Sequence, residues 1–190
     1  MLLSACAPSG TPAPSTTPGL PNPAAAPTTS SAPAAKPADY RRLLVTAADV
    51  SDDEDRFTER SSEADPNGQT GASAFFVNDQ DNRAISATVL VYPDAATATA
   101  TLKQLSGTLP TLVGGGTPQP LAVGTDGVAI SGEYPNEAKA VTLAFFTEGR
   151  ALVRLEFQSA QGDATTDKYV TTVAKMQQIA LRVGLTDANQ

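Results

Sequence analysis

The chain has 190 residues, and its 13 Lys and Arg residues against 20 Asp and Glu residues give a formal charge of −7. It contains no His, no Trp and a single Cys. Without His, neither a Ser-His-Asp or Cys-His nucleophile nor a His-ligated metal site is available. One Cys excludes an internal disulfide and a Cys-rich zinc or iron–sulfur site. An acidic chain with few aromatic residues is also a poor candidate for binding nucleic acid.

The first 38 residues differ in composition from the rest. They hold nine of the fifteen Pro residues and one charged residue, Lys36. Such a segment buries too little apolar surface to offset the entropy of ordering, so we predict a disordered tether over residues 6–38. As polyproline II at ~3.1 Å per residue, residues 7–38 span roughly 100 Å. Residues 39–190 carry a formal charge of −8 and are enough for one globular domain.

The single cysteine, Cys6, ends the run Leu3-Ser4-Ala5-Cys6. A branched apolar residue and two small residues before a Cys resemble the lipobox of bacterial lipoproteins. The resemblance implies that a diacylglyceryl group is attached to the Cys6 thiol and that residues 1–5 are the remnant of a signal peptide removed before Cys6. Two acyl chains are about what stable anchoring requires. We therefore expect a lipid-anchored protein on the extracytoplasmic face of a cell membrane.

The first part of the domain, 39–69, is predicted to be largely irregular. Thr46 is placed to cap a short turn through Asp49. Residues 51–69 carry seven acidic residues against two arginines. That composition indicates a solvated loop or a frayed helix, with a turn at 65–68.

Two strands and a helix are predicted next. The strands cover 72–77 and 84–92, and the second alternates apolar and polar residues with the period of two that a half-buried strand shows. A polar loop, 78–82, joins them. The helix covers 95–105, with Asp94 as its N-cap.

The remaining elements are strands and a long helix. We predict strand segments over 121–123 and 128–132, then strands 140–146 and 151–158, the last two joined by a tight turn at 148–150. In the final strand Val153, Leu155 and Phe157 are expected to face inward, with Arg154 and Glu156 in solvent. The helix covers 166–183, because its apolar residues are three or four positions apart, and Gly184 is placed as its C′ residue.

The order β-β-α-β-β-β-α predicts a single α+β domain, a mainly antiparallel sheet with two helices packed on one face. With the lipobox and tether, the segments 123–127 and 146–150 resemble the small envelope lipoproteins of mycobacteria and other actinobacteria. Several of those carry sensor-like or LpqN-like α+β domains. The disulfides of some sensor-type members are excluded by the single Cys.

Three segments resemble calcium-binding or phosphate-binding loops, and each has an ordinary structural explanation. Residues 52–55 and 78–82 are rich in oxygen ligands but lack the phasing of a calcium loop, so a solvated charge run and a hairpin tip are favoured. Gly114, Gly115 and Gly116 lack the Lys-Ser/Thr of a phosphate loop, which favours a linker. No metal or cofactor is therefore expected.

Two further groups of residues were considered, one for acid catalysis and one for an apolar binding pocket. Asp126, Glu133 and Glu148 are the candidates for a carboxylate-only hydrolase, although all three lie at predicted turns. The aromatic group that could line an apolar pocket is Tyr40, Tyr134, Phe145 and Phe146, with core packing as the favoured role.

The expectation for function is a non-catalytic, membrane-anchored lipoprotein whose domain binds an envelope protein, a cell-wall polymer or a lipid. One alternative is a carrier that holds an envelope lipid in an apolar cavity between sheet and helices. The other, less favoured, is the carboxylate-only hydrolase, which needs two acids with raised pKa in one concave site.

Overall fold

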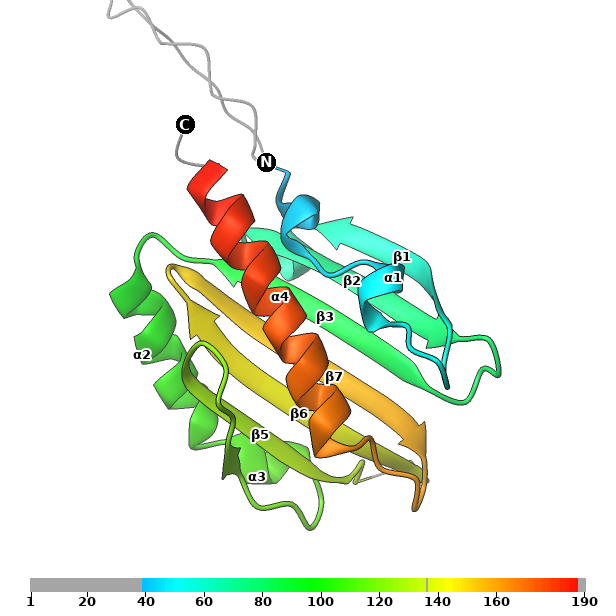
Figure 1. The fold of residues 1–190 in the computed structure, drawn as a ribbon. Coiled ribbons are helices and arrows are strands. Elements are labelled where there is room, and N and C mark those ends of the chain that lie inside the picture. The colour runs from blue at the N-terminus through cyan, green and yellow to red at the C-terminus, as the bar shows by residue number, and fades with distance from the viewer. Residues whose placement is uncertain (1–38, 136, 188–190) are drawn as a thin grey trace, which may run out of the picture. The chain divides into compact units, whose positions relative to one another are not determined.

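The computed structural model describes residues 39–135 and 137–187, which fold around a seven-stranded sheet (Figure 1). All neighbouring strands are antiparallel, in the order β1-β2-β3-β7-β6-β5-β4. The strands are β1 (Phe57–Ala64), β2 (Gly71–Asn78), β3 (Ala84–Val91), β4 (Gln119–Pro120), β5 (Thr125–Glu133), β6 (Lys139–Glu148) and β7 (Ala151–Ala160). The predicted α+β class with an antiparallel sheet is confirmed.

Two long helices accompany the sheet, α2 (Ala95–Ser106) and α4 (Asp167–Asp187). The short helical elements are η1 (Tyr40–Leu43), α1 (Ala47–Val50), η2 (Pro66–Gly68) and α3 (Leu109–Leu112). Within the described ranges, no helix is both long and apolar enough to cross a membrane.

One face of the sheet packs against α4. Side chains of β2, β6 and β7 meet the buried face of this helix, and Phe76, Phe146 and Phe157 are each at most 1% exposed. On the helix, Val173 and Leu181 belong to the same cluster. Each fully buried aromatic ring contributes roughly 2–3 kcal/mol by removal from water, so this layer is the main source of stability.

The other face packs against α2 and α3, which corrects the expectation that both helices lie on one face. Val141, Leu143 and Phe145 of β6 cluster with Leu102 of α2 and Leu109 of α3. Successive strand residues point to opposite faces, and the neighbouring Phe146 belongs to the α4 cluster. Strand β6 is therefore buried on both sides, and two layers are needed to cover it.

Local hydrogen bonds explain where two of the helices begin. The Thr46 N–H and hydroxyl both donate to Asp49 Oδ2 at 2.8 Å, which confirms the predicted cap of α1. Asp94 Oδ1 accepts the Thr97 N–H at 2.7 Å at the start of α2. That backbone hydrogen bond lowers the pKa of Asp94, because it stabilises the carboxylate form.

Strand β1 occupies part of the segment for which the sequence predicts a loop. It pairs with β2 from Phe57↔Asn78 to Ala64↔Ala72, with an irregularity between Glu59 and Ser61. All its residues after Phe57 are exposed, so the sequence lacks the alternation that marks a half-buried strand. Charged side chains and a bulge are ordinary features of an edge strand.

Gly184 lies within α4, which extends beyond the predicted end at residue 183. A Cβ at this position would lie 2.2 Å from Leu43 Cδ2. The glycine therefore allows η1 to pack closely against the helix, and its predicted role as a C′ residue is wrong.

Candidate binding groove

Helices α2 and α3 cover only part of their face of the sheet. They lie over β5, β6 and the end of β7 that carries Leu152. The side chains of β1, β2 and β3 on this face have no helix over them, and Phe75 is 36% exposed there. We call this uncovered part the open face; it consists of alternate residues of β1, β2, β3 and β7.

A groove of about 370 Å³ lies where the open face meets α2 and α3. Its floor carries hydroxyl groups from Ser73, Ser86 and Thr88, and its wall carries aliphatic groups from Leu105 and Leu112. Leu112 is 42% exposed, so its side chain is accessible from the groove. The groove therefore combines hydrogen-bonding groups with an apolar side, as ligand sites commonly do.

The strand register places four polar residues of the groove in one row across the sheet. Glu63 is paired with Ser73, Ser73 with Thr88, and Thr88 with Arg154. Three strand spacings separate the Cα atoms of Glu63 and Arg154 by about 14 Å. A carboxylate and a guanidinium thus lie at the two ends of a row of hydroxyls.

Arg154 is held in place by a polar network around Glu156. The carboxylate of Glu156 accepts hydrogen bonds from the Tyr134 hydroxyl, the Arg154 guanidinium and Gln158 Nε2, the last at 2.7 Å. Glu156 is only 5% exposed although no helix covers this strand segment. The prediction that Arg154 and Glu156 both point into solvent is therefore wrong for Glu156, which lies beneath its partners.

The network also affects Tyr134, which reaches over the open face from the end of β5. Burial and the hydrogen bond to Glu156 raise the pKa of the Tyr134 hydroxyl. The hydroxyl therefore remains a donor to Glu156. Glu156 thus accepts hydrogen bonds from three side chains, one of which, Arg154, lines the groove.

The three acidic residues considered for hydrolysis are far from forming a pair in this groove. Asp126 forms an ion pair with Lys103 (3.6 Å), and Glu148 forms one with Arg182 (3.1 Å). Glu133 lies at the opposite end of β5 from Asp126 and accepts from Gln161 Nε2 at 3.1 Å. The structure thus brings none of the three into the groove.

The oxygen-rich segments are satisfied by protein groups. Asp52 Oδ1 accepts the Glu54 and Asp55 N–H groups, and Asp55 forms an ion pair with Arg83 (3.1 Å). Asn78 Nδ2 donates to Asp55, Gln80 and Asn82. No cluster of three potential metal-ligating side chains occurs in ranges 39–135 and 137–187.

The four aromatic residues and the glycine triplet considered from the sequence do not form sites either. Phe145 and Phe146 lie on opposite faces of β6. Tyr134 packs against the cluster that contains Phe145 and Tyr40 against the cluster that contains Phe146, so the four aromatics form no common pocket. The glycine triplet, 114–116, runs along the edge of β5, where a Cβ on Gly116 would lie 2.6 Å from Ser131 O.

The layer between the sheet and α4 is filled by side chains, among them three Phe residues at most 1% exposed. The groove lies on the other face. Cys6 and the tether over residues 6–38 lie outside the described residues.

No protein-family model matches the chain, and no curated protein matches it. The crystal structure of the extracellular domain of PknH from Mycobacterium tuberculosis is similar in fold, with a TM-score of 0.53 and 13% sequence identity. The similarity covers 77% of this chain and 98% of the PknH domain. The comparison shows that the α+β architecture is shared with a mycobacterial extracellular domain.

The groove residues could have been found partly from sequence. Arg154, Glu156 and Gln158 alternate on a strand whose other residues are apolar, which indicates that one face of that strand is polar. On sequence alone these residues resemble ordinary surface groups. The contact of Glu156 with Tyr134, 22 positions away, has no local sequence pattern to reveal it.

Proposed function

We propose that the chain is a non-catalytic binding protein on the extracytoplasmic side of a bacterial membrane, anchored by lipid at Cys6. The lipobox-like run before Cys6 and the Pro-rich composition of residues 7–38 support an anchor and a tether. The shared fold with an extracellular domain supports the extracytoplasmic location.

The observation that carries the binding role is the buried Glu156 network beside an uncovered groove. A carboxylate of low exposure loses hydration, and it is stable only when hydrogen-bonded. Here three donors compensate that loss, and the result is a fixed Arg154 at the end of a row of hydroxyls. Such an arrangement suits a small ligand with hydrogen-bond acceptors near Arg154 and an aliphatic part near Leu105 and Leu112.

The anchor is tested by intact-mass measurement of the protein expressed in its native host. We expect a chain that begins at Cys6 and carries a diacylglyceryl group, and we expect Cys6→Ser to abolish both cleavage and lipid addition. An unmodified chain beginning at Met1 would contradict the anchor while leaving the groove untouched.

The groove is tested by native mass spectrometry of the protein purified from its native envelope. We expect a co-purifying small molecule that Thr88→Phe displaces, because the ring fills the floor of the groove. Ser61→Phe is the matched control, since it adds the same ring on edge strand β1 outside the groove lining. Equal ligand occupancy in both variants, or no bound molecule in the unmodified chain, would overturn this binding role.

The lipid-carrier alternative is favoured by one observation, the aliphatic wall formed by Leu90, Leu105, Leu112 and Leu152. An acyl chain would lie along this wall on the open face, rather than between the sheet and α4. The same mass measurement distinguishes the two, because a displaced species with the mass of an acyl lipid supports a carrier.

A further inference from the structure

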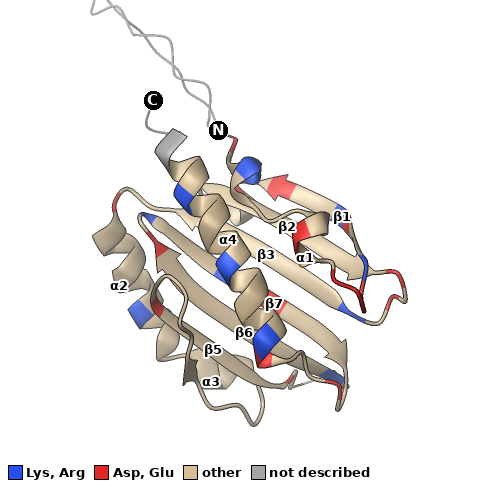
Figure 2. Ribbon diagram, viewed as in Figure 1, with Lys and Arg blue, Asp and Glu red and all other residues tan. Residues whose placement is uncertain are grey.

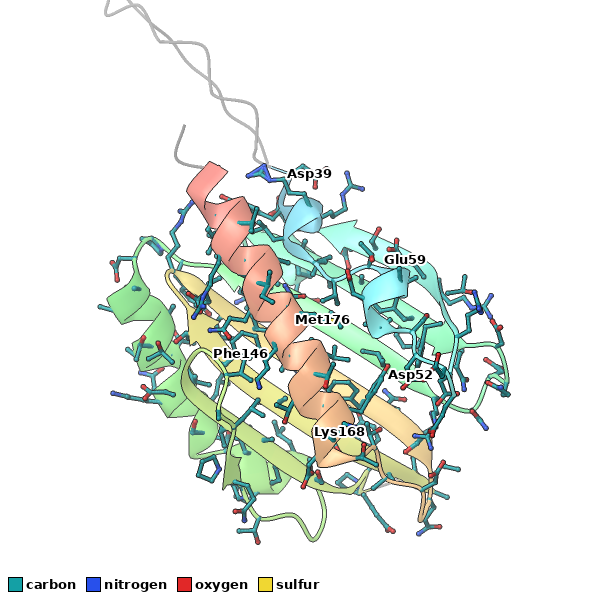
Figure 3. All side chains as sticks on the ribbon, viewed as in Figure 1. Asp39, Asp52, Glu59, Phe146, Lys168 and Met176 are labelled. Carbon is teal, nitrogen blue, oxygen red and sulfur yellow. The ribbon has the colours of Figure 1, made fainter. Side chains whose placement is uncertain are left out.

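Helix α4 carries an apolar stripe on the side that faces away from the sheet. Met176, Ile179 and Val183 are 37%, 60% and 62% exposed. Their spacing of three and four residues places them on one side of the helix. The buried residues Val173 and Leu181 lie on the opposite side, against the sheet. Met176 is labelled on this outer surface in Figure 3.

A basic stripe runs beside the apolar one. Lys168, Lys175 and Arg182 follow one another at intervals of seven residues, which nearly superimposes them along the helix (Figure 2). Lys168 and Lys175 form no ion pair with any described residue, and Arg182 is paired with Glu148 at 3.1 Å. The domain as a whole carries a charge of −8, so this concentration of cations on one surface is unusual for the chain.

We propose that this outer face of α4 lies on the surface of an anionic lipid membrane. An interfacial helix needs an exposed apolar strip to enter the headgroup region and flanking Lys or Arg to attract anionic lipids. Both are present here in parallel stripes. Asp167 precedes Lys168 at the start of α4, and from there to Val183 the helix has no Asp or Glu to oppose that attraction.

A membrane fits this face better than a protein partner. The core of a protein interface is depleted in Lys, whereas Lys175, which forms no ion pair with a described residue, borders this apolar strip. The strip from Met176 to Val183 is about 11 Å long and 10 Å wide, well below the roughly 800 Å² that each partner contributes to a stable complex. No aromatic side chain of the described residues is exposed on it to anchor such an interface.

The inference goes beyond the proposed function and does not depend on lipid at Cys6. The described chain begins beside the same helix, where Arg42 Nη2 donates to Gly184 O at 3.4 Å. Since the groove lies on the opposite face of the sheet, contact through α4 would direct the groove away from the bilayer.

The test uses the full chain with Cys6→Ser, so that no lipid is attached, and exploits the absence of Trp from the sequence. Ile179→Trp places a single fluorophore on the proposed contact, and Gln104→Trp is the control on α2, on the other face of the sheet. Vesicles contain phosphatidylcholine alone or an equal mixture with phosphatidylglycerol. With the anionic vesicles at low salt, we expect a blue shift of the indole emission in the Ile179→Trp variant and none in the Gln104→Trp control.

A second experiment tests whether the charges of Lys168 and Lys175 contribute to membrane binding. In the Ile179→Trp background, Lys168→Gln with Lys175→Gln should lower the partition coefficient by at least tenfold, because each lysine contributes about fivefold. Lys103→Gln with Lys139→Gln is the matched control elsewhere on the domain. Circular dichroism checks that all variants fold.

Three results would overturn the proposal. One is indole emission of the Ile179→Trp variant that anionic vesicles leave unchanged, and another is an equal shift in the Gln104→Trp control. The third is a concentration-dependent dimer, seen by analytical ultracentrifugation, that Ile179→Ser abolishes, since the face would then be an interface between two copies. Each leaves the lipidation and groove experiments unaffected.

Discussion

The two faces of the sheet differ in how completely they are covered. On the α4 face, aromatic side chains from β2, β6 and β7 form one continuous cluster that is almost fully buried. On the α2 face, the cluster stops at β7, and β1, β2 and β3 present a surface of mixed polar and apolar side chains. Phe75 and Phe76 are neighbours in the chain yet fall on different faces, 36% and 0% exposed. Strands β2 and β3 therefore pack into the core with one side and leave the other side open to solvent.

The largest difference in stability between the two faces is expected when those two phenylalanines are substituted. Phe76→Ala should lower the free energy of unfolding by about 3–5 kcal/mol, because it leaves a cavity in the α4 layer. Phe75→Ala should lower it by less than about 1 kcal/mol, because the ring is already partly in water. Urea unfolding followed by circular dichroism measures both. Similar losses for the two variants would show that the open face is covered in solution.

The Glu156 network gives an intermediate effect. Glu156→Ala removes the shared acceptor of Tyr134, Arg154 and Gln158, and we expect a loss of about 1–3 kcal/mol in the free energy of unfolding. Glu156→Gln, which keeps one acceptor oxygen, should cost less. Glu59→Ala on the exposed edge strand is the control, with a change within about 0.5 kcal/mol. If Glu156→Ala were as mild as the control, the network would not be a stable part of the groove.

The smallest effect concerns alkaline pH and compares one tyrosine from each face. Burial raises the pKa of Tyr134 beside the groove and of Tyr169 on α4. A tyrosine whose pKa is higher in the folded state contributes stability below the ordinary pKa of about 10 and loses that contribution as the pH rises above it. Stability should therefore fall as the pH rises above about 10, toward the raised pKa of the folded state.

Tyr134→Phe and Tyr169→Phe should each make that fall smaller, as measured by urea midpoints across the same pH range. A fall of unchanged size in Tyr134→Phe would mean that the hydroxyl is free of Glu156 in solution. A fall of unchanged size in Tyr169→Phe would mean the same for its hydrogen bond to Val50 O.

Much of the fold was predictable because its strongest patterns are local. The alternation in β3 and β7, the spacing of apolar residues in α4 and the Asp94 cap all lie within single elements. The arrangement of the helices was missed, although β6 contained the relevant pattern. Its residues from Ala140 to Thr147 are buried without interruption, and a strand without a polar side needs a layer on each face.

The groove was less predictable because it is assembled from distant parts. Glu63, Thr88 and Arg154 come from three different strands and meet only through the register of the sheet. Edge strand β1, which supplies Glu63, is held through its backbone and leaves almost no pattern in its side chains. The sequence showed apolar residues at helical spacing in α4, but it grouped Met176 and Val183 with Val173. Spacing alone does not show that Val173 is buried whereas Met176 and Val183 lie on the exposed side.

The pairing of β3 with β7 also determines how the protein is made. The two strands are joined from Ala84↔Gln158 to Val91↔Ala151, so the sheet stays in two unconnected pieces until residue 158 has been synthesised. The α4 face is covered only when the following helix is complete. Contacts between such distant segments form slowly. A nascent chain therefore cannot join the two halves of its sheet or close its core until most of the sequence has been synthesised.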